Sequence, residues 1–172
     1  MDPLRTSRLL LVPADDRLVG LEQKDRAAFF RLLGVEPVDD WPSDSLRDAL
    51  PFFTRILQST PEAVGWLSWY WILEESGRRH LVGGGGFKGL PSDIGAIEIG
   101  YEVRPECRQQ GFATEAVTAL VAWALSDDRV CRVIAETSPD NQASIGVLLR
   151  AGFVPSGVRS DTGLPRYERR RE

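Results

Sequence analysis

Residues 94–125 constrain the fold more than any other part of the chain. In the sequence IGAIEIGYEVRPECRQQGFATEAVTALVAWAL, a strand pattern leads through a short glycine-bearing loop into a helix pattern. A helix N-terminus leaves its first backbone N–H groups unpaired and carries partial positive charge. A glycine in the turn lets a phosphate approach those N–H groups closely. The segment therefore predicts a pyrophosphate-binding site.

Both patterns are regular. In the strand, apolar residues alternate with Glu98, Gly100 and Glu102, and Pro105 ends the ladder because it has no N–H to donate. The helix has apolar residues at the i, i+3, i+4, i+7 spacing of one buried face. They are Ala113, Ala116, Val117, Leu120, Val121 and Ala124.

The loop matches neither common nucleotide motif. A dinucleotide fingerprint needs G-x-G-x-x-G, and a P-loop needs Gly-Lys followed by Ser or Thr. Residues 108–113, RQQGFA, instead resemble the R/Q-x-x-G-x-G/A signature of the GNAT superfamily, the acyl-CoA N-acyltransferases. Downstream, NQAS at 141–144 fits the N-x-x-S of that family's second motif, and AGF follows at 151–153. Together these motifs resemble most the branch of Rim-type ribosomal-protein N-terminal acetyltransferases.

Composition agrees with an ordinary globular enzyme. The 172 residues fit one domain, which we expect to span residues 1–172. The chain is 42% hydrophobic and 27% charged. Its net charge of −4 argues against a nucleic-acid partner and is compatible with cationic amines.

We expect a cytoplasmic protein. No secretory signal opens the chain, and its longest apolar runs are too short to span a bilayer. Cys107 and Cys131 lack metal-ligand spacing, so no metal is expected. His80 is the only histidine and is interpreted as structural.

The order of elements predicts an α+β fold. Strands are expected at 9–12, 66–74, 81–88, 97–103, 132–137, 154–159 and 165–170, and helices at 17–20, 24–33, from Ser43 or Ser45 to 58, 113–125 and 142–151. The resemblance implies a mixed, mostly antiparallel seven-stranded sheet flanked by helices. In that fold the sheet splays between strands 4 and 5, and the pantetheine arm of the donor lies in the gap.

Acetyl transfer to an amine requires a bound donor, a deprotonated amine, a stabilised oxyanion and a protonated leaving thiolate. For the co-substrate acetyl-CoA, the loop supplies backbone N–H groups, the preceding strand supplies main-chain groups, and Asn141 either bonds the pantetheine arm or caps the following helix. The expected donor-binding residues are Val103, Arg108, Gln109, Gln110, Gly111, Phe112, Ala113, Thr114 and Asn141.

The catalytic candidates are Ser144 and Glu98. Many members of the family place a tyrosine acid after the second motif, but here the only later tyrosine is Tyr167. Ser144, three residues after Asn141, is the candidate for protonating the thiolate, and the alternative is a helix serine whose hydroxyl bonds only within its own helix. Glu98 is the candidate base, against the alternative of a salt bridge on a strand face. Glu102 shares its face but lies nearer the loop.

Two further features have structural interpretations. The four consecutive glycines at 83–86 predict a bulge or a close backbone approach rather than phosphate binding. Trp41, near Asp39, Asp40 and Asp44, is a candidate for the acceptor pocket, although an ordinary solvated loop is the alternative.

These features predict an acetyl-CoA-dependent N-acetyltransferase that works by direct attack on the thioester. The first acceptor considered is a protein N-terminal α-amine, by resemblance to the Rim-type branch. The second is a small-molecule amine such as an amino acid, polyamine or antibiotic. A third hypothesis is that the chain is a non-catalytic acyl-CoA-binding or sensing module. The chain is expected to act as a monomer or homodimer, with no nucleic-acid or membrane partner.

Overall fold

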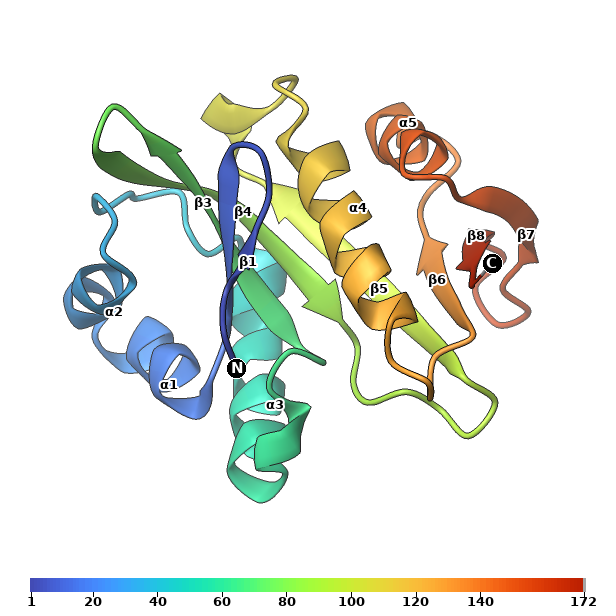
Figure 1. Ribbon diagram of the computed structural model, residues 1–172, viewed down its shortest axis with the longest axis horizontal. Coiled ribbons are helices and arrows are strands. Elements are labelled where there is room, and N and C mark those ends of the chain that lie inside the picture. Colours follow the sequence, from blue (N-terminus) through green and yellow to red (C-terminus); the bar gives the residue numbers. More distant parts are fainter. Residues whose placement is uncertain (172) are drawn as a thin grey trace.

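In the computed structural model, which describes residues 1–171, eight strands form one mixed sheet (Figure 1). The order across the sheet is β1-β2-β3-β4-β5-β6-β8-β7. Every neighbouring pair is antiparallel except β5 and β6, which are parallel. The strands are β1 (Leu4–Arg5), β2 (Leu9–Pro13), β3 (Ser68–Glu75), β4 (Arg78–Phe87), β5 (Ala96–Val103), β6 (Arg132–Glu136), β7 (Val154–Val158) and β8 (Pro165–Arg170).

The helices begin and end where the sequence places capping residues. Ser43, one of the two candidates, caps α3 by accepting a hydrogen bond from the N–H of Leu46, and Gly34 ends α2 in the left-handed conformation. The elements are α1 (Asp16–Lys24), α2 (Arg26–Leu33), α3 (Asp44–Ser59), α4 (Phe112–Leu125) and α5 (Gln142–Arg150), with short 3₁₀ turns η1 (Pro61–Ala63) and η2 (Pro105–Cys107).

The helices form two groups on opposite faces of the sheet, and each group packs over one hydrophobic core. Alternate residues of β2 divide between the two cores: Leu9 and Leu11 pack with α4 and α5, whereas Leu10 packs with α1, α2 and α3. Figure 1 shows α4 crossing the sheet and α5 beside β6. A ligand that passes through the sheet would therefore meet different helices on its two faces.

The sheet differs from expectation in one respect and agrees in another. It has eight strands rather than seven, because Leu4 and Arg5 pair with Leu11 and Leu10 as a two-residue strand that is too short to give a sequence pattern. The expected splay lies between β5 and β6, the fourth and fifth strands of the sequence prediction. Their pairing covers only 96–98 against 132–134, although β5 continues to Val103.

The glycines of β4 allow the close approach predicted from the sequence. A Cβ atom on Gly84 would lie 2.7 Å from the Trp41 ring, and one on Gly86 would lie 1.8 Å from the carbonyl oxygen of Leu67. A register shift in the β3–β4 pairing accompanies the run. The glycines therefore let neighbouring backbone and aromatic groups contact both faces of β4.

The loop before β2 fixes the start of α4. Glu115, in the first turn of α4, accepts hydrogen bonds from the hydroxyls of Thr6 and Ser7 and from the backbone N–H and Nε of Arg8, at 2.6–2.9 Å. Arg8 also donates to the carbonyl of Gln110 at 3.0 Å. Burial raises the pKa of Glu115, but these hydrogen bonds outweigh it and bring the pKa to about 2.

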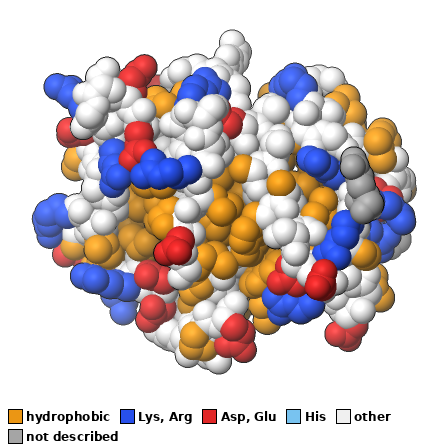
Figure 2. Space-filling view, viewed as in Figure 1, with side chains coloured by type: hydrophobic (Ala, Val, Ile, Leu, Met, Phe, Trp, Pro, Cys, Tyr) orange, Lys and Arg blue, Asp and Glu red, His pale blue; other side chains and the backbone are white. Residues whose placement is uncertain are grey.

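On the face seen in Figure 2, hydrophobic side chains gather in the middle and charged side chains lie mostly around them. Among residues 1–171, no helix combines the length and the apolar character needed to cross a membrane.

We predict that Gly86→Ala destabilises the protein by about 3 kcal/mol or more, because the new methyl group must displace the backbone at Leu67. Urea unfolding measures the change. Gly100→Ala is a matched control, since Gly100 pairs directly with Gly86 and a Cβ there meets no atom within 4 Å. A loss for Gly86→Ala no larger than that of the control would contradict the packing argument.

We also predict that Glu115→Gln lowers stability at pH 7 by up to about 3 kcal/mol. Because the folded pKa of Glu115 is depressed to about 2, its contribution is complete above the unfolded pKa of 4.5 and is lost as pH falls toward 2. Urea titrations at pH 7 and pH 3.5 should show the deficit of the variant shrinking by about 1 kcal/mol. Glu106→Gln, at an exposed carboxylate, should change little. An equal deficit at both pH values would refute this account.

Candidate functional site

A cavity of about 690 Å³ lies between the end of β5, the start of α4 and α5. Its lining includes all the residues predicted to bind the donor, together with Ser144. They are Val103, Arg108, Gln109, Gln110, Gly111, Phe112, Ala113, Thr114 and Asn141. Two motifs about thirty positions apart in the sequence therefore face one space, which we call the donor cavity.

The loop into α4 is shaped to bind an anion. Gln109 and Gly111 have φ values of 61° and 83°, so the chain turns sharply just before the helix. The first hydrogen bond of α4 runs from the N–H of Glu115 to the carbonyl of Gly111. The N–H groups of the preceding residues have no partner four positions back within the helix, and they lie at its positive end. This end of α4 borders the donor cavity.

The gap between β5 and β6 exposes backbone to the same cavity. The N–H of Lys88 donates to the carbonyl of Glu98, so even-numbered residues of β5 bond to the β4 side of the ladder. The main-chain groups of Tyr101 and Val103 consequently point toward the side where β6 has already separated. Both residues line the donor cavity.

Asn141 and Ser144 lie at the entrance to α5. The side-chain oxygen of Asn141 accepts a hydrogen bond from the N–H of Ser144 at 3.1 Å, which is the helix-capping role expected as one alternative. Asn141 also borders the donor cavity, so capping does not remove it from the site.

Tyr101 and Arg150 also line this cavity, and the sequence analysis assigned neither of them to the site. The hydroxyl of Tyr101 lies 3.0 Å from Oγ of Ser144 and 3.2 Å from its carbonyl oxygen. Burial raises the pKa of Tyr101, while the hydrogen bond with Ser144 and the charge of Arg150 act in the opposite direction. Arg150 lines the cavity and lies 3.4 Å from the Thr114 hydroxyl. It follows Ala143 by seven positions and Val147 by three, and both of those residues also line the cavity, so the shared helix face was the available signal.

Glu98 lies outside the lining of the donor cavity. Its carboxylate pairs with Lys88 and lies 4.0 Å from Arg159. This is the salt-bridge geometry that the sequence analysis gave as the alternative to catalysis, and the catalytic role of Glu98 stays a prediction.

A second cavity, of about 200 Å³, adjoins the first on the opposite face of the sheet. Gly84, Gly85, Gly86 and Gly100 contribute to it from the strands, and α3 contributes Ser45, Leu46, Ala49 and Phe53. Tyr101 and Glu102 line both cavities. We call this space the α3-side cavity.

Trp41 does not contribute to that cavity, so its assignment to the acceptor pocket is not supported. Its side chain is 1% exposed and its Nε1–H donates to Glu22, 2.7 Å away. Tyr70 donates to the other carboxylate oxygen. Burial raises the pKa of Glu22 to about 7, with a further contribution from the like charge of Glu102. The three side chains form a buried polar cluster between α1 and the sheet.

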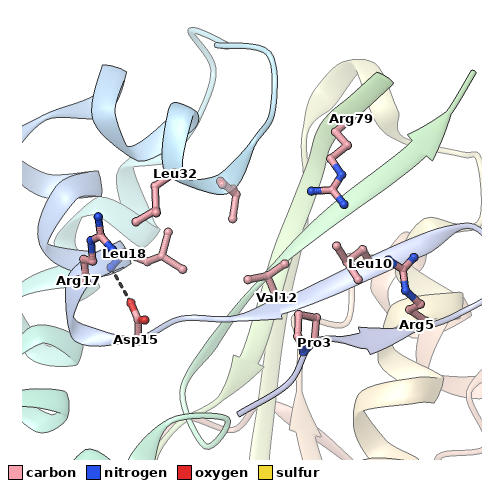
Figure 3. Close-up of a pocket in the computed structure, with 10 residues that line it drawn as sticks. Pro3, Arg5, Leu10, Val12, Asp15, Arg17, Leu18, Leu32 and Arg79 are labelled. Carbon is pink, nitrogen blue, oxygen red and sulfur yellow. Dashed lines mark hydrogen bonds between the residues drawn. The ribbon is translucent and has the colours of Figure 1, made fainter. Parts of the chain in front are cut away.

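A third hollow, of about 450 Å³, lies between the N-terminal strands and the helices α1 and α2 (Figure 3). None of the predicted site residues lines it. Three of its four charged residues are engaged elsewhere: Arg5 and Arg79 both pair with Glu74, and Asp15 caps α1. The residues of the sequence motifs therefore favour the other two cavities as the functional site.

Comparison with known proteins identifies the family. Residues 17–154 match the model of an acetyltransferase (GNAT) domain. An uncharacterized N-acetyltransferase of Bacillus subtilis strain 168, YjdG, is 34% identical over 151 residues, covering 88% of this chain and 89% of the relative. A second from the same strain, YoaA, is 36% identical over 88 residues, covering 51% of this chain and 50% of the relative.

Solved structures share the fold at low identity. RimL, described as a ribosomal L7/L12 alpha-N-protein acetyltransferase in complex with coenzyme A, superimposes with a TM-score of 0.67 at 19% identity, covering 98% of each chain. The ribosomal-protein-S5-alanine acetyltransferase of Vibrio fischeri gives 0.69 at 15% identity, covering 100% of this chain and 98% of the other. RimJ of Mycobacterium smegmatis, in complex with a CoA disulfide, gives 0.63 at 21% identity and covers 98% and 85%.

The family match, the relative along most of its length and the shared fold together show that this chain belongs to the GNAT acetyltransferases and is an N-acetyltransferase.

Proposed function

We propose that this N-acetyltransferase transfers the acetyl group of acetyl-CoA to a primary amine by direct attack on the thioester in a ternary complex. The observation that carries the proposal is the donor cavity, where the loop before α4, the gap beside β5 and the start of α5 meet. We also propose that the whole chain acts as one domain, since its strands belong to one sheet.

In this proposal the donor lies along the cavity. Its pyrophosphate binds the N–H groups at the start of α4, with Arg108 and Arg150 adding positive charge. Its pantetheine arm pairs with the main-chain groups of Tyr101 and with the N–H of Val103, as an added strand would, while the carbonyl oxygen of Val103 already accepts a hydrogen bond from Nε of Arg108 at 3.2 Å. An N–H in this part of β5 then stabilises the oxyanion of the tetrahedral intermediate.

Ser144 protonates the departing thiolate in the same scheme. A serine hydroxyl is a weak acid, so it needs a nearby group that replaces the proton. The Tyr101 hydroxyl, 3.0 Å from Oγ of Ser144, is placed for that exchange.

For the acceptor, we favour the α-amine of a protein N-terminus. The similarity to structures named as ribosomal-protein acetyltransferases supports this choice at the level of the fold. An α-amine has a pKa near 8 and needs less help to lose a proton than a lysine amine near 10.4. A small-molecule amine is the second candidate. A non-catalytic acyl-CoA-binding role is disfavoured by membership in an acetyltransferase family.

We predict that acetyl-CoA at 100 times its Kd raises the Tm by roughly 5–10 °C, because binding to the folded state alone contributes about 2.7 kcal/mol. Differential scanning fluorimetry measures the shift. Free acetate is the control and should cause none. The absence of any shift over the full solubility range of acetyl-CoA would contradict donor binding.

We predict that an acceptor panel will find an amine-dependent release of free thiol from acetyl-CoA. The panel contains short peptides with free or blocked N-termini, amino acids, polyamines and aminoglycosides, and mass spectrometry locates the acetyl group. If an α-amine is the acceptor, the blocked peptides are inactive. Turnover only with small amines would favour the second candidate.

Ser144→Ala should lower kcat on the best acceptor by about 10- to 100-fold without weakening acetyl-CoA binding. Ser126→Ala, at the far end of α4, is the matched control and should retain wild-type activity. An unchanged kcat in Ser144→Ala would remove Ser144 from the mechanism.

A further inference from the structure

Glu102 occupies the junction of the two cavities. Together with Tyr101, it lines both the donor cavity and the α3-side cavity. Adjacent residues of a strand point to opposite faces, so Tyr101 lies with α4 and α5, where it contacts Ser144, and Glu102 lies with α3. Glu102 therefore presents a carboxylate on the face opposite the proposed acid.

The side chain of Glu102 is held by the start of α3. Ser43 caps that helix by accepting a hydrogen bond from the N–H of Leu46, at 3.2 Å, and donates its own hydroxyl proton to Oε2 of Glu102. Since the Ser43 hydroxyl is oriented by both contacts, it fixes one carboxylate oxygen of Glu102. The other oxygen has no such contact to Ser43.

The α3-side cavity has room for an amine beside this carboxylate. Its glycines bring no side chains, and a Cβ on Gly100 would meet no atom within 4 Å. Leu46, Ala49 and Phe53 of α3 give it an apolar wall. An ammonium group that enters here has Glu102 as the carboxylate on the border with the donor cavity.

Three other charged groups of these elements have partners of their own. Glu22 of α1 is buried with Trp41 and Tyr70, and Asp44 pairs with Arg47 in the first turn of α3. Lys88, which lines the α3-side cavity, pairs with Glu98.

Glu98 is less suitably placed than Glu102, because it lines neither cavity and lies between Lys88 and Arg159. A carboxylate held by two cations would have to break those pairs before accepting a proton.

We propose that Glu102, positioned by Ser43, is the carboxylate that deprotonates the acceptor amine as it enters through the α3-side cavity. This inference rests on the proposed acetyl transfer and concerns the acceptor half of the same site.

The acceptor nitrogen loses two protons, and each is handled on a different face of the sheet. The acceptor enters as R–NH₃⁺, and Glu102 takes one proton and passes it to solvent. The neutral nitrogen attacks the thioester carbon, the C–N bond forms, and collapse of the tetrahedral intermediate breaks the C–S bond. The second proton lost by nitrogen balances the proton that the thiolate receives through Ser144.

The test is the pH dependence of kcat/KM for Glu102→Gln, with acetyl-CoA and the most active peptide or amine of the panel. At pH 7 we expect a loss of about 100-fold or more. The loss should shrink as pH rises toward the pKa of the free amine, because the amine then loses its proton without help. The thermal shift with acetyl-CoA should match that of wild type.

Two variants serve as comparisons. Glu98→Gln should stay within about threefold of wild type and keep its pH profile. Ser43→Ala should lose activity with the same pH trend as Glu102→Gln but to a smaller extent, since it removes only the group that orients the carboxylate. A purely structural role of Ser43 would lower activity equally at all pH values.

The outcomes separate the two proposals. If the wild-type protein turns over and Glu102→Gln has an unchanged pH profile of kcat/KM, the role of Glu102 is overturned and acetyl transfer stays intact. The same holds if the loss that shrinks with rising pH appears in Glu98→Gln instead. A uniform loss at every pH in Glu102→Gln also overturns it. No amine-dependent thiol release from the wild-type protein overturns the proposed function and this inference with it.

Discussion

The separation of β5 from β6 is the constraint on which the rest of the site depends. The two strands pair over only three residues each, yet β5 runs on to Val103 with β4 paired along its other side. Main-chain groups in that stretch need a hydrogen-bonding partner, and the open side faces the donor cavity. The same short stretch also ends in the loop that begins α4. Backbone geometry alone thus brings the N-terminus of α4 and the edge of β5 that β6 no longer covers into one space.

Alternation along β5 then divides the chemistry between the faces of the sheet. Tyr101 turns toward α4 and α5, where Ser144 lies 3.0 Å from its hydroxyl, and Glu102 turns toward α3 and Ser43. Gly100 of β5 leaves room on the second face, since a Cβ there would meet no atom within 4 Å, whereas the glycines of β4 are already in close contact with neighbouring groups. A single strand can in this way contact a donor on one face of the sheet and an acceptor on the other.

The donor half could be predicted from the sequence because its signals are local. The turn at Gly111, the helix that follows it and the cap at Asn141 each depend on a few consecutive residues. The side-chain contacts across the site depend on distant pairs: Ser43 and Glu102, on the acceptor side, are 59 positions apart, and Tyr101 and Ser144, on the donor side, are 43 apart. No periodicity reports such contacts. The same reason applies to Trp41, which packs in the core beneath α1, α2 and α3 and donates to Glu22, 19 positions away. The eighth strand was missed because two residues cannot show alternation.

The two candidate carboxylates show that the face of a strand on which a residue lies does not by itself tell whether the residue reaches the site. Its position along the strand matters more. Glu98 and Glu102 share a face, so the sequence pattern treats them alike. They are four positions apart, and in that interval β6 separates from β5 while it stays paired with β8. Glu98 lies where β6 still pairs with β5, in a surface of charges that includes Lys88 and Arg159. Glu102 lies where the sheet has opened. Under our proposals, proton removal from the amine by Glu102 and proton delivery to the thiolate by Ser144 occur on opposite faces of the sheet at this opening.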